Sequence, residues 1–314
     1  MVLVLTLLAY GCPMQAICAA FGFDERTVKN WWDRAGEHCE SFHKHMLSQQ
    51  QLDLGHVQAD EIKAKTQGGY HWIAMAISVP TRLWLGGVAG ASRSRQLIDD
   101  LFSQIRSIAL CRPMVIAVDG FSAYVGCIRR AFRSPLPRYG QSGRPKLVSW
   151  PDIAIVQVVK QRSQGSFNVT RRIVQACQST IDRIREATQG IPGVINTSYI
   201  ERINATFRQR LHWLTRRSRS LAQKPQTLLS GIYIVGSLYN FCDLHHSLKV
   251  KIWIDERQYR WVYTTPAMAA AITDHQWSVH ELLAFRIPPP KWMPPKSIGR
   301  PSKQTLEIIQ QWAS

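Results

Sequence analysis

The sequence is poor in acidic residues and has no apolar run long enough to cross a membrane. Its 314 residues include 21 Asp and Glu against 39 Lys and Arg, which gives a formal net charge of +18 at pH 7. A surplus of this size is unusual for a metabolic enzyme and favours a polyanionic partner, with a ribosome-associated or merely adhesive basic protein as the alternative. The arginine pairs are spread along the chain, at Arg129-Arg130, Arg171-Arg172 and Arg216-Arg217. This dispersion predicts a folded basic groove and not a disordered basic arm.

Regularly spaced cysteines are also missing. The seven cysteines form no Cys-X-X-Cys pair, which argues against the common zinc and thiol-redox motifs and predicts reduced, mostly buried thiols. The apolar start from Met1 to Cys12 superficially resembles a secretion signal, but it lacks the positive charges that precede the apolar part of such signals. These absences predict a soluble, cytoplasmic protein.

Residues 1–36 have the pattern of three short helices, and Asp24 is a natural N-cap for the last of them. The pattern predicts a helix-turn-helix DNA-binding region in which Gly22 makes the turn and Thr27, Lys29 and Asn30 point outward, toward DNA. The side chains expected to pack inward are Ala16, Ile17, Ala20 and Phe21. An ordinary three-helix packing unit is the alternative.

Residues 37–54 are polar and show no strong apolar periodicity, which predicts a linker helix. From residue 55 three strands, a helix, a buried strand, a short helix and another strand follow, and helices are expected at 171–188, 197–214 and 225–241. This order predicts an α/β fold, an RNase H-like mixed five-stranded sheet flanked by helices, over residues 55–250. Residues 251–314 are expected to form a basic C-terminal extension.

Three carboxylates fall where such a sheet can bring them together. Asp60 lies on the first strand, Asp119 directly follows the apolar run Val115–Val118, and Glu201 lies in a later helix. In-line cleavage of a phosphodiester uses two metal ions, and Mg²⁺ prefers hard oxygen ligands. We therefore expect Asp60, Asp119 and Glu201 to hold two Mg²⁺ ions. The alternatives are a strand-end cap for Asp119 and a solvated helix charge for Glu201.

Glu61 competes with Asp60 for this role. Successive side chains of a strand point to opposite faces, so we expect only one of the two to reach the metals, and we favour Asp60. The helix that carries Glu201 also carries Arg202, Arg208 and Arg210, whose cations can meet DNA phosphates.

Three acidic segments carry a resemblance to a known family. They are Gln58-Ala-Asp-Glu-Ile62, Val118-Asp-Gly-Phe-Ser-Ala-Tyr124 and Asn196-Thr-Ser-Tyr-Ile-Glu-Arg-Ile-Asn204. They resemble the acidic blocks of DDE-type bacterial insertion-sequence transposases, in particular those of the insertion-sequence-one family. The segments after the glutamate, 211–217 and 239–248, also look like that family, so the resemblance covers roughly residues 10 to 250.

The resemblance implies a function and a set of roles. Asp60, Asp119 and Glu201 would be the metal-binding catalytic residues, and Asn204, Arg208 and Arg210 would lie near donor DNA. The implied activity is Mg²⁺-dependent cleavage at the element ends and transfer of the 3′ hydroxyl into target DNA, with Mn²⁺ as a substitute metal. The implied protein is a nucleoid-associated homo-oligomer.

Two features depart from the family. The step from Asp119 to Glu201 is 82 residues, longer than the family's compact spacing, and no cysteine-rich zinc module precedes the helix-turn-helix. The first indicates an inserted segment and the second a shortened or divergent N-terminus. Two other functions therefore stay open: a catalytically decayed helix-turn-helix DNA-binding protein, and an RNase H-like nuclease without strand transfer.

Overall fold

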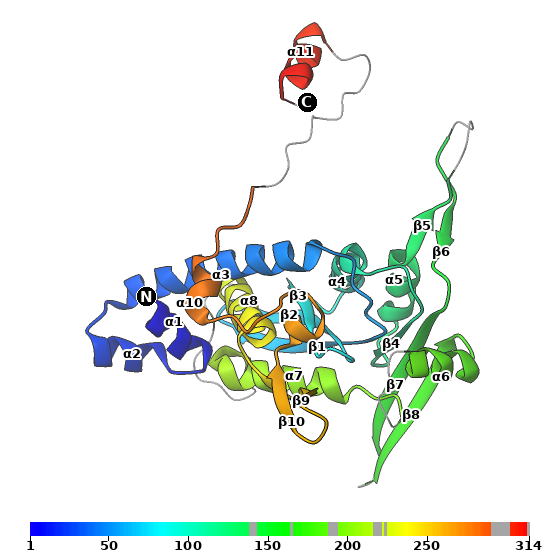
Figure 1. Ribbon diagram of the computed structural model, residues 1–314, viewed down its shortest axis with the longest axis horizontal. Helices are drawn as coiled ribbons and strands as arrows, with labels where there is room; N and C mark the ends of the chain where they lie inside the picture. Colours follow the sequence, from blue (N-terminus) through cyan, green and yellow to red (C-terminus); the bar gives the residue numbers. More distant parts are fainter. Residues whose placement is uncertain are drawn as a thin grey trace.

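A computed structural model describes residues 1–137, 143–163, 166–187, 194–215, 222, 225–289 and 302–312. A six-stranded mixed sheet with the strand order β3-β2-β1-β4-β7-β8 forms its centre (Figure 1). The strands are β1 (His56–Thr66), β2 (Gly69–Ser78), β3 (Trp84–Gly90), β4 (Met114–Val118), β7 (Ile153–Ser163) and β8 (Ser166–Gln175). β1, β4 and β7 run parallel, whereas β2, β3 and β8 are antiparallel to their neighbours. The predicted α/β class with a mixed sheet is confirmed.

The prediction of five strands is wrong by one strand. Residues 171–175, expected at the start of a helix, belong to β8, and the helix α6 (Gln178–Ala187) begins only after them. β8 pairs along β7, for example Val158 with Arg171 and Val156 with Ile173. This pairing outweighs the local helical preference of the arginine-rich segment, because strand formation depends on cross-strand neighbours more than on the segment itself.

Helices cover both faces of the sheet. On one face α4 (Arg95–Ile108) packs on β2 and β3 and contacts α5 (Ala123–Ala131). On the other face α7 (Ser198–Arg210) packs on β1 and β2. The buried Gln58 side chain of β1 accepts hydrogen bonds from the backbone N–H groups of Tyr199 and Ile200, both at 3.0 Å. These N–H groups have no partner within the helix, so Gln58 fixes the start of α7 on the sheet.

The N-terminal helices are part of the same core. They are α1 (Val2–Ala9), α2 (Met14–Phe21) and α3 (Glu25–Ser48), and Asp24 caps α3 as predicted. The helix predicted at 37–54 is present as the second half of α3, which ends at Ser48, but it is not a linker, because it buries Cys39, Phe42 and Leu47 beside α8 (Pro225–Phe241). Of the four side chains expected to point inward from α2, only Ile17 is buried; the others, Ala16, Ala20 and Phe21, are exposed.

The C-terminal part also differs from a simple extension. Residue 250 falls inside a two-stranded hairpin, β9 (His245–Trp253) and β10 (Tyr259–Thr264). The segment after it contributes Trp277 and Leu282 to the core. The other elements are β5 (Arg133–Pro135), β6 (Leu147–Ser149), η1 (His212–Leu214), α9 (Pro266–Ala269), α10 (Val279–Ala284) and α11 (Lys303–Trp312). The proline-rich basic stretch at 290–301 and the arginines at 216–219 lie outside the described residues.

Across the described ranges, every helix is too short or too polar to span a bilayer.

Candidate metal centre

The centre begins where β4 ends. β1 and β4 are parallel, with Gln58 opposite Ala117, and two further steps of this register bring Asp60 level with Asp119. β4 ends at Val118 while β1 continues to Thr66, so the sheet opens between β1 and β7 at this level. The Asp119 carboxylate accepts a hydrogen bond from the Phe121 N–H at 2.8 Å, which turns the chain toward α5.

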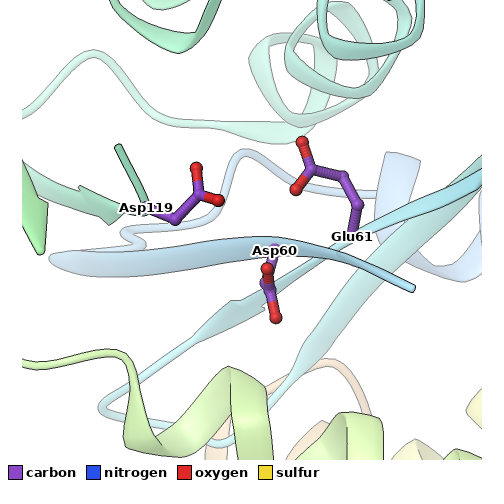
Figure 2. A group of neighbouring side chains, drawn as sticks. All are labelled: Asp60, Glu61 and Asp119. Atoms are coloured by element: carbon purple, nitrogen blue, oxygen red, sulfur yellow. The ribbon is translucent and has the colours of Figure 1, made fainter. Parts of the chain in front are cut away.

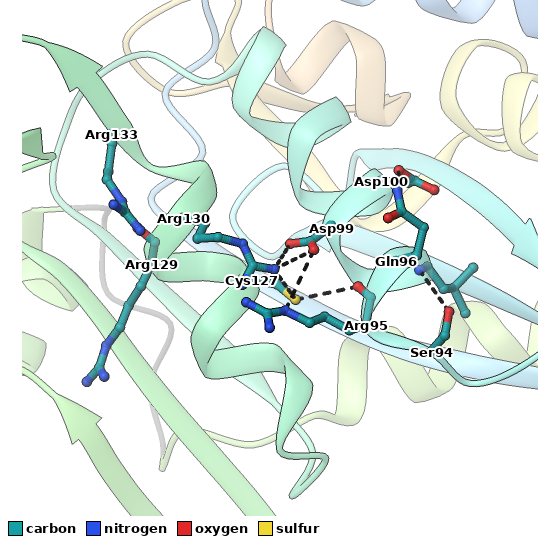
Figure 3. A network of polar contacts seen from close by, with 10 residues as sticks. Ser94, Arg95, Gln96, Asp99, Asp100, Cys127, Arg129, Arg130 and Arg133 are labelled. Carbon is teal, nitrogen blue, oxygen red and sulfur yellow. Dashed lines mark hydrogen bonds and ion pairs between the residues drawn. The ribbon is translucent and has the colours of Figure 1, made fainter. Parts of the chain in front are cut away.

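A polar network holds α5 in place (Figure 3). The carboxylate of Asp99 on α4 accepts hydrogen bonds from Arg130 on α5, and the Cys127 thiol of α5 lies 3.6 Å from the backbone oxygen of Arg95. Because α5 follows Asp119 directly, these links between two helices also fix the loop that carries the carboxylate.

Asp60, Glu61 and Asp119 offer carboxylate oxygens that all lie within 4.8 Å of one another. In Figure 2, Asp60 and Glu61 leave β1 on opposite sides, and Asp119 lies beyond the end of β4. The expectation that only one of Asp60 and Glu61 could reach the site is wrong. Side chains from both faces of β1 converge with Asp119, because no strand fills the space beside β1 past Val118.

Arg93, in the segment after β3, holds two of these carboxylates. Its Nη2 atom donates to Glu61 at 2.9 Å and also to Asp119, and its guanidinium lies 4.3 Å from the centre of the Phe121 ring. The Glu61 side chain is almost completely buried, whereas Asp119 and Arg93 are about one-third exposed. Sequence reasoning missed Arg93 because nothing in its local pattern relates it to residues 26 and 32 positions away. The sequence feature that could have placed Glu61 in the site was its position next to Asp60.

Burial and mutual repulsion disfavour the ionised forms of the carboxylates in this centre. The pKa of Asp60 is raised to about 6, chiefly by burial; a backbone hydrogen bond opposes this rise, and the neighbouring carboxylates Glu61, Asp119 and Glu201 contribute to it. Burial is also the main cause that raises the pKa of Glu61, which the Arg93 guanidinium partly offsets. One arginine therefore compensates only part of the negative charge, and a further cation would be stabilised here.

Glu201 and the two aspartates line one open cavity of about 970 Å³, which we call the acidic cavity. Glu201 does not join the tight group: its Oε1 atom accepts a hydrogen bond from Thr197 at 2.6 Å and is ion-paired with Lys160 of β7. Asn204, one turn further along α7, is buried and donates to Asp60 at 2.9 Å. Arg208 lines the same cavity.

Four other predicted DNA-binding residues do not reach this cavity. Arg210 is paired with Asp243 at 2.8 Å, stacks over the Tyr10 ring at 4.4 Å and lines a different cavity. Thr27, Lys29 and Asn30 lie in the first two turns of α3, where Thr27 and Lys29 are half-buried and Asn30 is exposed.

The donor set fits a small divalent cation. All three clustered ligands are hard oxygens, the ligand type that Mg²⁺, Mn²⁺ and Ca²⁺ prefer, and no thiol or imidazole belongs to the group. The basic side chains of Lys160, which is paired with Glu201, and Arg208 also line the cavity, and their positive charge suits an anionic substrate. Comparison with protein-family models gives no match for this chain, and comparison with curated proteins finds no similar sequence.

Proposed function

We propose that this chain is a DDE-type transposase that cuts DNA and joins the cut end to target DNA on an RNase H-like catalytic domain. The observation that carries the proposal is the meeting of Asp60 and Asp119 at the end of a buried parallel strand, with Glu201 in the same cavity. The strand order, antiparallel β3-β2-β1 followed by parallel β4 and β7, is compatible with an RNase H-like arrangement. The net charge of +18 suits a DNA partner.

Asp60, Asp119 and Glu201 are the residues that would hold Mg²⁺, and Glu61 adds a fourth carboxylate to the set. Bound Mg²⁺ would activate the attacking oxygen and stabilise charge on the phosphate and the leaving oxygen. Asn204 keeps the Asp60 carboxylate oriented through its 2.9 Å hydrogen bond. Thr197 and Lys160 hold Glu201 at the edge of the cavity. Glu201 would bind Mg²⁺ in place of its ion pair with Lys160.

The chemistry assigned to the cavity is substitution at phosphorus. A water molecule or a 3′ hydroxyl forms a new P–O bond, and the P–O bond to the 3′ oxygen of the cleaved strand breaks. Arg208, on the cavity wall, supplies a cation for the phosphate oxygens. No side chain of the protein becomes covalently linked to DNA.

The test is a cleavage and strand-transfer assay. Labelled duplexes carrying the sequences that flank the chain's own gene are incubated with a supercoiled target plasmid in Mg²⁺, with Asp60→Asn, Asp119→Asn and Glu201→Gln variants beside the wild type. Asp100→Asn is the matched control, because Asp100 is exposed on α4 and does not line the acidic cavity.

We expect joined products with the wild type and the control, and none with the three site variants. Cleaved but unjoined DNA would identify a nuclease. DNA binding without any Mg²⁺-dependent product would contradict the proposal and indicate a non-catalytic DNA-binding protein.

A further inference from the structure

A second cavity, of about 760 Å³, lies beside another face of α7. Its polar lining includes Arg82, Tyr199, Arg202, Arg210, His245 and His246. Glu201 lines the acidic cavity and Arg202, the next residue, lines this one. Because these two adjacent residues of α7 line different cavities, the helix lies between a cavity rich in carboxylates and one rich in arginines.

Two arginines of this second cavity have no acidic partner within the described part of the chain. Arg82 and Arg202 form no ion pair there. The one carboxylate in the lining, Asp243, is already engaged: Arg210 pairs with it at 2.8 Å, and the Tyr10 hydroxyl donates to it at 2.5 Å. The cavity therefore carries a surplus of positive charge that its own acid does not neutralise.

The fold holds Arg82 in a costly conformation. Its backbone φ is 58°, in the left-handed region that non-glycine residues rarely adopt. The guanidinium stacks 3.9 Å from the centre of the Tyr199 ring and donates to the Val79 carbonyl. Burial, followed by the positive charge of the nearby Arg82, lowers the pKa of His245, which favours the neutral imidazole.

The β9–β10 hairpin continues the positive surface outward. β9 begins at His245 in the cavity and carries the exposed Lys249 and Lys251. The Lys251 ammonium lies 3.8 Å from the ring centre of Tyr259, and the Lys249 ammonium lies 4.6 Å from that of Trp261. Neither lysine has an ion-pair partner among the residues that the structure describes.

We propose that the Arg82–Arg202–His245 cavity, together with Lys249 and Lys251 of the hairpin, binds the phosphate backbone of double-stranded DNA. Four cationic side chains, Arg82, Arg202, Lys249 and Lys251, spread over a cavity and a hairpin exceed what one small anion needs, whereas duplex DNA presents one phosphate charge per ~1.7 Å of its axis. The choice of DNA rests on the proposed function. The site itself is separate from the acidic cavity and needs no metal.

The test measures binding alone. A labelled duplex of random sequence is titrated with protein in EDTA at several salt concentrations, with fluorescence anisotropy as the readout. Arg202→Gln is the main variant, because Arg202 is exposed and its removal leaves the core intact. Arg82→Gly is a second variant, since glycine adopts the positive φ of this position freely. Lys44→Gln is the charge-matched control, because Lys44 is exposed on α3, which Figure 1 shows, and lines neither of the two cavities.

Arg202→Gln and Arg82→Gly should each weaken duplex binding by about tenfold near ~0.1 M salt and reduce the salt slope by about 0.9, as expected when one phosphate contact is lost. Wild-type affinity and slope in both variants, or an equal loss in Lys44→Gln, would overturn the inference. Tighter binding of the wild type to duplex RNA, lost in the variants, would overturn the choice of DNA. Because EDTA prevents cleavage, these outcomes are independent of the strand-transfer assay.

Discussion

The two cavities beside α7 differ in the sign of the charge that they leave uncompensated. On one side Asp60, Glu61 and Asp119 crowd together with a single arginine between them. On the other side Arg82 and Arg202 face a carboxylate that is already neutralised. Burial disfavours the charged forms of Asp60, Glu61 and Arg82, whereas Arg202 is exposed.

The difference in charge predicts a cationic ligand for the acidic side of α7 and an anionic ligand for the basic side. A carboxylate with a raised pKa is relieved by a cation, and a cluster of unpaired cations is relieved by an anion. If both proposals hold, α7 carries a metal-binding residue and a DNA-binding residue at the neighbouring positions Glu201 and Arg202. If the two cavities act independently, variants of one should leave the function of the other unchanged.

Asp119→Asn should lower the rate of Mg²⁺-dependent DNA cleavage on the order of 10³-fold, because a metal ligand contributes several kcal/mol to transition-state stabilisation. Duplex binding in EDTA should stay at the wild-type level or tighten, since a negative charge is removed. Quantified cleavage and anisotropy on the same preparation check both. Parallel loss of binding would mean that the two sides are not separate.

Asp60→Asn should stabilise the fold at alkaline pH. The pKa of Asp60 is raised to about 6 in the folded protein, so its contribution is favourable below pH ~4 and is lost as the pH rises through 6. The shift of about two units corresponds to roughly 3 kcal/mol, which the variant should regain at pH 8 and not at pH 4. Urea denaturation at both pH values measures this. A stabilisation independent of pH would have another cause.

Arg93→Ala should tighten the binding of Mn²⁺ by about tenfold, because the guanidinium that now compensates Glu61 and Asp119 is removed. It should also destabilise the protein, since the buried Glu61 loses its partner. Electron paramagnetic resonance of free Mn²⁺ gives the affinity without any activity assay. Weaker Mn²⁺ binding in a folded variant would show that Arg93 organises the carboxylates and does not compete with the metal.

Lys249→Gln combined with Lys251→Gln should weaken duplex binding only a few-fold, because both side chains are exposed and each contributes one screened phosphate contact. The salt slope should fall by up to about 1.8 for the pair. The double variant Lys44→Gln with Lys303→Gln, both exposed and outside the two cavities, controls for the loss of two positive charges. An unchanged slope would limit the positively charged side to the cavity itself.

The sequence predicted best those parts of the site whose position follows from local pattern. Asp119 follows an apolar run that forms a buried strand, and Asp60 lies on the strand β1 beside it. The convergence of Glu61 was not predictable, because it depends on β4 ending at Val118 and leaving one edge of β1 unpaired while β2 continues along the other. Arg93 reaches the site from a different segment, so only the folded chain brings it there.

The errors in the fold have the same origin. The residues at 171–175 look helical in isolation, but pairing with β7 makes them a strand. The polar surface of residues 37–48 hides a narrow buried stripe, Cys39, Phe42 and Leu47, that packs beside α8 more than 180 residues away. Tertiary contacts of this kind leave little trace in the local sequence.

The neighbouring residues Glu201 and Arg202 give the most direct test of the whole account. Duplex affinity in EDTA and single-turnover cleavage in Mg²⁺ would be measured for Glu201→Gln and Arg202→Gln. We expect Glu201→Gln to abolish cleavage while binding DNA at least as tightly as the wild type, and Arg202→Gln to lose affinity for DNA. Cleavage at the wild-type rate by Glu201→Gln, or wild-type affinity of Arg202→Gln, would contradict this expectation.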